Sequence, residues 1–512
     1  MPLRPLNRDQ AWLLPPTLGD LIPSDHPARF VAGFVDGLGC EEWTELEIGL
    51  DGEELGAPAY HPRALLSIWL YGFMTGTRSS RKLEVACRDQ VPYLWLTGWQ
   101  RPDHNTIWRF YRAHRQSMRR LLKYTVATAM DLKLIDLALQ AVDGTKILAN
   151  AAGDRTYDTA ELQRLLVRTE AAIIEMEKQN EEGNDVPLPR LKDELKEAHV
   201  LRQKIRDAIS HIGQVAGLKR INLTDEDSQL MKGRDGIING YNAQAVVSPL
   251  ATENTGVNGM VITAVDVVNT AADSGQLVPM LEKAEEITGE RVQTTVADGG
   301  YHTAANLEAG EQRGQTLVMA ERSQSAATKP YFKDQFRYDA QKDSYICPRG
   351  HSLHFRGFRR DRRNNLCRYH VYSASRTICH NCPAYGTCTK DAHSGRALWI
   401  GNSDLLLRRH RQWMKTDEAR CLYARRQQII EPTFGILKEQ MGARRFLLRG
   451  LLNVRAEFTL MATAFNLRVL SRIRNRLSTS QLTSELNHLT ALKDTLKIFN
   501  INIYFNYALS AS

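Results

Sequence analysis

The sequence predicts an α/β protein with a mixed β-sheet core, an all-helical N-terminal region and two insertions. Two observations predict the sheet. Strand-like runs alternate with helical stretches, which is typical of α/β folds. Two of those runs lead into aspartate and glycine, in AVDGTK and VADGGY. A third observation, the helical spacing of apolar residues in the first 125 residues, predicts the N-terminal helices.

The chain is too long for one compact core, since it has 512 residues. Its 43% hydrophobic and 24% charged residues are typical of a folded globular protein. It contains no run of 18 apolar residues, and MPLRPLNRDQ lacks the apolar core of a signal peptide. We therefore expect a cytoplasmic protein with no membrane partner.

The composition changes along the chain and suggests how it is divided. The expected parts are a helical N-terminal domain (1–125), a sheet domain (126–475) with a helical-hairpin insertion (158–212) and a Cys/Arg-rich insertion (340–395), and a peripheral tail (476–512).

The N-terminal region predicts three short helices, the third of them basic. Their sequences are ALLSIWLYGFMTG, SSRKLEVACRDQ and RPDHNTIWRFYRAHRQSMRRLL. This arrangement resembles a helix-turn-helix unit, in which Arg109 and Arg112 would contact DNA. The alternative is a helical bundle that only packs.

The hairpin is predicted from two helical patterns separated by GNDVPLP. Asp158 and Glu161 have the spacing of a capping box, which marks the start of the first helix. Apolar residues then recur every three or four positions in both helices, so the two helices should pack along an apolar seam.

Asp143 and Asp298 are the candidate catalytic acids, because each follows an apolar strand and precedes a glycine. Carboxylates at the ends of neighbouring strands repel each other when ionised, and a divalent cation relieves that repulsion. The alternative is that each aspartate only forms a turn with its own loop. Asp266 is a weaker candidate, because Val-Val follows it rather than glycine.

Four cysteines are candidates for one structural zinc site, namely Cys347, Cys379, Cys382 and Cys388. Cys379 and Cys382 form a C-x2-C pair, and four thiolates can bind zinc tetrahedrally. A metal would stabilise a short, loop-rich segment that has little core of its own. A redox C-x2-C pair is the alternative, but no βαβ pattern surrounds this one.

The same segment is strongly basic, with seven arginines and one acid between residues 356 and 376. Phenylalanines and tyrosines are interleaved with the arginines, a combination that suits phosphate neutralisation with base stacking. The candidate DNA contacts are Arg359, Arg360, Arg362 and Arg363. The alternative is a solvated basic surface.

A third acid, Glu431, occurs in YARRQQIIEPTFGILKEQ. Because proline is tolerated in the first turn of a helix, Pro432 places Glu431 at or near a helix N-terminus. Lys438 lies two turns further and should share its face of the helix. A surface Glu-Lys face is the alternative.

Together these motifs resemble the DDE-type bacterial insertion-sequence transposases, which have a ribonuclease-H-like catalytic core. Asp143 in VDGTKI, Asp298 in ADGGYH and Glu431 in IIEPTFGILKE match the three family acids. Tyr423, Arg426 and Lys438 are similar to a family signature around the glutamate. The spacing from Arg426 to Glu431 is one residue longer than in the best-known version, so Arg425 is an alternative to Arg426.

The resemblance implies that the three acids hold Mg²⁺ (or Mn²⁺) ions. It also implies double-stranded DNA partners, namely the terminal inverted repeats of the element and target DNA, a homodimer in the synaptic complex, and association with the nucleoid. Two alternatives stay open: a transposase-derived DNA-binding protein without catalysis, and a ribonuclease-H-like metal-dependent nuclease.

Overall fold

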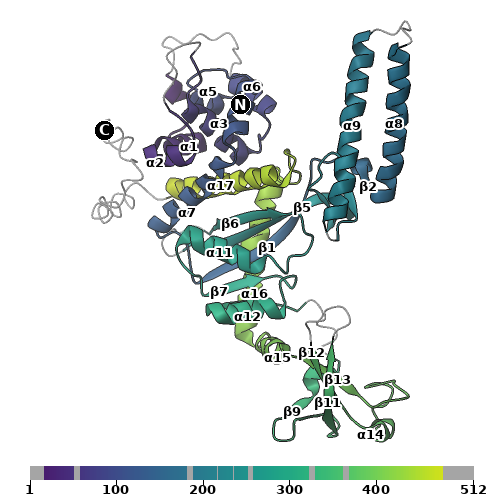
Figure 1. Cartoon of the computed structure of the whole chain (residues 1–512). Coiled ribbons are helices and arrows are strands. Elements are labelled where there is room, and N and C mark those ends of the chain that lie inside the picture. The colour runs from purple at the N-terminus through teal and green to yellow at the C-terminus, as the bar shows by residue number, and fades with distance from the viewer. Residues whose placement is uncertain are drawn as a thin grey trace, which may run out of the picture.

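The computed structural model describes residues 17–50, 58–181, 188–215, 217–233, 236–251, 258–321, 329–360 and 368–476. Arg362, Arg363 and the tail from residue 477 lie outside these ranges. The described chain has mixed helices and sheets, as predicted. A central sheet is covered by helices on both faces, the N-terminal helices lie at one end, and a small second sheet lies at the other (Figure 1).

The central sheet contains three antiparallel strands followed by two parallel ones. The order is β6-β5-β1-β7-β8, and β4 also pairs with the outer edge of β5. The bounds are β1 Leu139–Leu148, β4 Gln229–Gly233, β5 Gly236–Pro249, β6 Met260–Val268, β7 Thr294–Ala297 and β8 Thr316–Met319.

Alternate residues of β1 enter two different hydrophobic cores, as the period-two geometry of a strand requires. Leu139 and Ala141 belong to the core that contains α7, α16 and α17, whereas Val142 belongs to the core formed with α11 and α12. Those helices are α7 Leu121–Asp131, α11 Leu277–Thr288, α12 Ala304–Arg313, α16 Asp417–Gly435 and α17 Leu451–Arg476. The sheet is therefore the middle of three layers.

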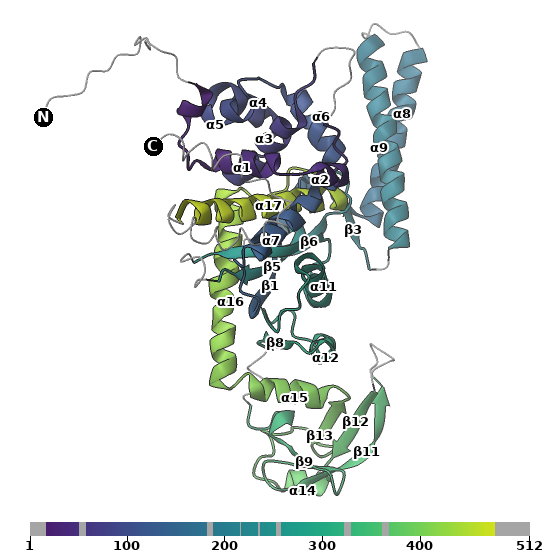
Figure 2. The ribbon, with the colours of Figure 1, turned by 90° about the vertical axis from the view of Figure 1, so that its left-hand side faces the viewer.

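The described part of the first 120 residues is helical, apart from its loops. The helices are α1 Pro27–Asp36, α2 Cys40–Glu45, α3 Pro62–Thr75, α4 Ser80–Asp89, α5 Val91–Leu96 and α6 His104–His114, with 3₁₀ turns at Leu18–Leu21 and Ser117–Arg120. Helix α17 lies between these helices and the sheet (Figure 2). Because α17 is buried on both sides, the N-terminal helices and the sheet share one continuous core.

The predicted helical hairpin is confirmed. Its helices are α8 Thr159–Glu181 and α9 Leu188–Gln214, which project from the sheet as a long antiparallel pair (Figure 1). The capping box forms in both directions, because Asp158 N donates to Glu161 Oε2 (2.8 Å) and Glu161 N donates to Asp158 Oδ1 (2.9 Å). A short pair, β2 Thr156–Asp158 and β3 Arg220–Asn222, closes the base of the hairpin.

The cysteine-containing segment forms its own five-stranded antiparallel sheet, in the order β13-β12-β11-β10-β9. Its elements are β9 Arg337–Asp339, β10 Ser344–Ile346, β11 Ser352–Arg360, β12 Arg368–Ser373, α14 Arg376–His380 and β13 Ala397–Gly401. Helix α15 (Asp404–Trp413) follows and leads into α16. An ion pair between Arg411 and Asp334 (2.5 Å) joins α15 to the start of the segment.

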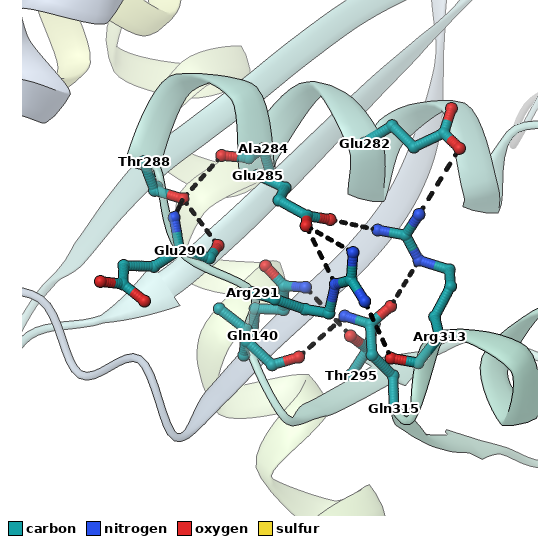
Figure 3. A network of polar contacts seen from close by, with 11 residues as sticks. Gln140, Glu282, Ala284, Glu285, Thr288, Glu290, Arg291, Thr295, Arg313 and Gln315 are labelled. Atoms are coloured by element: carbon teal, nitrogen blue, oxygen red, sulfur yellow. Dashed lines mark hydrogen bonds and ion pairs between the residues drawn. The ribbon is translucent and has the colours of Figure 1, made fainter.

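A polar network holds the start of β7 in place (Figure 3). Arg291, just before β7, pairs with Glu285 of α11 (2.7 Å), and Arg313 of α12 pairs with the same carboxylate. Inside the sheet, Gln140 of β1 donates to Thr295 of β7 (3.0 Å). These contacts fix β7 against β1, α11 and α12 at the end of the strand opposite Asp298.

Candidate active site

Asp143 and Asp298 lie side by side on neighbouring parallel strands. The register pairs Val142 with Ala297, so Asp143 is the next residue of β1 and Asp298 directly follows the last residue of β7. Neighbouring strands are about 4.8 Å apart, and strand alternation directs both side chains to the face covered by α16. The sequence prediction of two acids on neighbouring strands is thus confirmed. The expected break after Asp143 is wrong, since β1 continues through Gly144 to Leu148.

Asp143 is partly buried, and burial makes its negative charge unfavourable. The pKa of its carboxyl is raised to about 6, chiefly by burial and to a lesser extent by the nearby Asp298 and Asp273, although Arg426 and the Gly144 N–H oppose the rise. Arg426 Nη1 lies 2.9 Å from Asp143 Oδ2, and both side chains are less than one-fifth exposed. The acids therefore create a site that favours a positive charge, which a guanidinium supplies in this structure.

Glu431 lies inside α16, not at a helix N-terminus, so that prediction is wrong. The helix begins at Asp417, where Thr416 caps it by accepting from Ala419 N (3.3 Å). Pro432 is accommodated within the helix, which ends in a π-helical turn at Ile436–Gln440. Ile429, Ile430 and Phe434, on either side of Pro432, are buried against the sheet. Their burial offsets the cost of a proline inside the helix, so the helix continues past it.

The basic residues on either side of Glu431 reach β1. Arg426 contacts Asp143 and lies over the Tyr423 ring, with Cζ 5.8 Å from its centroid. Lys438, in the π-helical turn, donates from Nζ to Thr145 Oγ1. Arg425 is exposed and lines a different pocket with Ile135 and Gln428, and it is Arg426 that contacts Asp143. Glu431 is exposed on the same helix, between the two contacts.

Comparison with family models identifies this arrangement. Residues 346–471 match the transposase DDE domain, and residues 16–113 match a transposase domain called DUF772. The chain is a DDE-type insertion-sequence transposase. Comparison with curated proteins and with solved structures gave no significant match.

The two matches cover different parts of the transposase. The DDE-domain match contains the cysteine segment from the end of β10 onwards, α15, α16 and most of α17, and therefore Glu431 and Lys438. The DUF772 match contains α1 to α5 and all but the last residue of α6. Asp143 and Asp298 lie between the two matches and are placed only by the structure. A DDE transposase is an enzyme that cleaves DNA and transfers its strands.

Asp266 of the transposase lies on β6, the strand beyond β5, and is neutralised by two cations. Lys283 Nζ lies 2.7 Å from its Oδ2, and Arg455 Nε lies 2.9 Å from its Oδ1. Because both of its carboxylate oxygens are paired with cations, Asp266 has a structural role. This agrees with the sequence analysis, in which Asp266 is the weaker candidate for a catalytic acid.

The four candidate zinc ligands line one small cavity of about 30 Å³. Two of their sulfurs accept backbone hydrogen bonds, Cys347 Sγ from His351 N and Cys379 Sγ from Arg396 N, each at 3.3 Å. Burial raises the pKa of the Cys388 thiol, and the other three cysteines raise it further. All four are free thiols. Among the described residues, no three His, Cys, Asp or Glu side chains are grouped closely enough to hold a metal.

The candidate DNA-contacting arginines that the structure describes are exposed. Arg109 and Arg112 lie on the outer side of α6 beside Trp108, which is 37% exposed. Arg359 and Arg360 end β11, next to Phe358. None of the helices of the described ranges is both long and apolar enough to span a lipid bilayer.

Sequence reasoning missed a polar group on the opposite face of β1. It consists of Lys146, Asn242, Gln244, Asp273 and Tyr301. Asp273 lies in a loop without a strand pattern, so its approach to β1 has no local signal. The GYNAQAVV motif at Gly240 was the available clue, because it places two amides inside an otherwise apolar strand.

Proposed function

We propose that this transposase cuts DNA at the ends of an insertion sequence and joins the freed ends to target DNA. The observation that carries this proposal is the position of Asp143 and Asp298 on adjacent parallel strands, opposite a helix that bears Glu431. The strand order supports a ribonuclease-H-like core, because Asp143 lies on the first of its five main strands and Asp298 directly follows the fourth.

Asp143, Asp298 and Glu431 would hold Mg²⁺ or Mn²⁺. The donor set fits such ions, since two neighbouring carboxylates raise each other's affinity for positive charge. When bound, the metal would activate a water or 3′-hydroxyl nucleophile and stabilise the leaving oxygen. In this structure Arg426 forms an ion pair with Asp143, and the Glu431 side chain is exposed. For this reason the three acids are not gathered around one point.

The residues around the acids have distinct proposed roles. Tyr423, Arg426 and Lys438 would contact the DNA, since a guanidinium and an ammonium on one helix can both neutralise phosphate. When the acids bind metal, the Arg426 guanidinium would leave Asp143 and pair with a phosphate of the DNA instead. Because strand joining requires two DNA ends, we propose a homodimer in the synaptic complex, working on DNA in the nucleoid.

A strand-transfer assay tests the proposed function. Purified protein, Mg²⁺, a duplex carrying one terminal repeat and a plasmid target should yield joined products. Cleaved but unjoined DNA would instead identify a nuclease. Binding without cleavage would identify a DNA-binding protein that has lost catalysis.

Arg359 and Arg360 should contribute sequence-independent DNA affinity. We expect alanine at both positions to weaken binding to all duplexes and to reduce the slope of log K against log salt by about 0.9 for each lost phosphate contact. Arg109→Ala or Arg112→Ala should instead reduce the preference for terminal-repeat DNA. Binding isotherms at several salt concentrations measure both effects. Alanine at the exposed Arg164 and Arg168 of α8 is the matched control, and a slope equal to this control would contradict the prediction.

The cysteine cavity should hold one structural zinc. Zinc would neutralise four thiolates whose charges would otherwise repel one another, and the two backbone N–H donors would stabilise the bound sulfurs. We expect about one zinc per chain in protein purified without chelator. Cys382→Ser should lose the metal, whereas Cys421→Ser, at an exposed position outside the cavity, should keep it. Zinc-free wild-type protein would contradict this proposal.

A further inference from the structure

Gly144 is a glycine because three polar side chains occupy the space above it. A Cβ at this position would lie 2.2 Å from Gln244 Nε2, 2.8 Å from Asp273 Oδ1 and 2.9 Å from Asn242 Oδ1. Real Cβ contacts are never this short, so any larger residue would displace the group. The glycine beside Asp143 thus serves close packing on the face opposite α16.

The Gln244 amide, on β5 opposite Gly144, connects the loop of Asp298 to the sheet. Its Oε1 accepts from the hydroxyl of Tyr301, which is fully buried three residues after Asp298. Its Nε2 donates to Asn242 Oδ1 (2.9 Å) and to Asp273 Oδ1 (3.0 Å). Donors and acceptors alternate along this chain, so the amide has only one favourable orientation.

Asp273 and its partners hold that orientation. Oδ1 of Asp273 also accepts from Asn242 Nδ2 (2.7 Å) and Lys146 Nζ (3.1 Å). Asn306 donates to the carbonyls of Tyr301 (2.7 Å) and Ser274 (2.8 Å), so it ties the Asp273 loop to the Asp298 loop. Both loops are therefore anchored to one buried amide under β1.

We propose that Gln244 and Tyr301 are positioning residues that set the spacing of the Asp143 and Asp298 carboxylates. The inference rests on the proposed metal-dependent function. Neither residue touches DNA, because both are fully buried and face away from α16. Gln244 supports β1 beneath Gly144 and holds Tyr301, and through it the turn in which Asp298 Oδ1 accepts from Gly300 N. Loss of either contact lets the two acids separate.

The test compares two tyrosine-to-phenylalanine variants. Tyr301→Phe removes only the hydroxyl that binds Gln244. Tyr241→Phe is the matched control, because Tyr241 is equally buried on β5 and donates to Asp225 (2.7 Å) instead. Mn²⁺ binding to the full-length proteins is measured by electron paramagnetic resonance of the free ion. We expect Tyr301→Phe to weaken Mn²⁺ binding about 10- to 100-fold, and Tyr241→Phe to leave it unchanged.

Two further measurements distinguish positioning from simple loss of structure. High Mn²⁺ should restore cleavage by Tyr301→Phe, because the carboxylates remain, but should not restore Asp143→Asn. Gln244→Glu places a negative charge beside Asp273 and should weaken Mn²⁺ binding more than Tyr301→Phe does. Its near-UV circular dichroism spectrum should remain like that of the wild type, which would show that the fold is kept. Wild-type Mn²⁺ affinity in Tyr301→Phe, or an equal loss in both tyrosine variants, would overturn the inference. Equal Mn²⁺ binding by wild type and Asp143→Asn would overturn the proposed metal site itself.

Discussion

Asparagine at Asp143 is expected to abolish DNA cleavage while DNA binding survives. The substitution keeps the shape of the side chain but removes the negative charge, and loss of one metal ligand costs on the order of 10³-fold or more in rate. Asp298→Asn and Glu431→Gln should have the same effect. Single-turnover cleavage of a terminal-repeat duplex measures the rate, and a gel-shift titration measures binding.

Asp266→Asn provides the control for this prediction. It is the same substitution at another partly buried aspartate of the sheet, but its carboxylate is already paired with Lys283 and Arg455. It should change cleavage little. Asp143→Asn also removes a buried charge whose pKa is raised to about 6, so the variant should remain folded. Near-normal cleavage by Asp298→Asn would refute the assignment of the acids.

Several features of the fold were predictable because their signals are local. The reciprocal contacts of Asp158 and Glu161 depend on residues three positions apart, and the hairpin seam depends on helical periodicity. The adjacency of Asp143 and Asp298 was predictable for another reason. Two apolar strands that carry similar motifs and belong to one sheet have few alternative arrangements.

Other features depend on contacts between distant segments. Pro432 alone suggested a helix start, but Thr416, Asp417 and Glu418 form a stronger start signal earlier in the chain. Gly144 suggested that the strand ends at Asp143, whereas the real constraint on this glycine is the approach of Gln244 from β5. The ion pair of Arg426 with Asp143 joins residues 283 positions apart, and no local pattern predicts such a contact.

Alanine at Glu457 is expected to destabilise the whole protein by about 3–5 kcal/mol, since it breaks a buried ion pair. Arg78 Nη1 lies 2.7 Å from Glu457 Oε1, and the two side chains are only 7% and 2% exposed. Glu457 also accepts from Leu447 N and Leu448 N at 3.0 Å. The variant would leave an arginine and two backbone donors buried without their partner. Chemical denaturation monitored by circular dichroism measures the loss.

The consequence should reach both family-matched regions, because Arg78 belongs to one and Glu457 to the other. We expect a single unfolding transition in wild type and in Glu457→Ala. The double variant Arg78→Met, Glu457→Leu should recover part of the lost stability, since it removes both charges and fills their space. Glu170→Ala breaks an exposed pair with Arg206 and should cost about 0–1 kcal/mol. If Glu457→Ala cost no more than Glu170→Ala, the buried pair would not be what joins the N-terminal helices to α17.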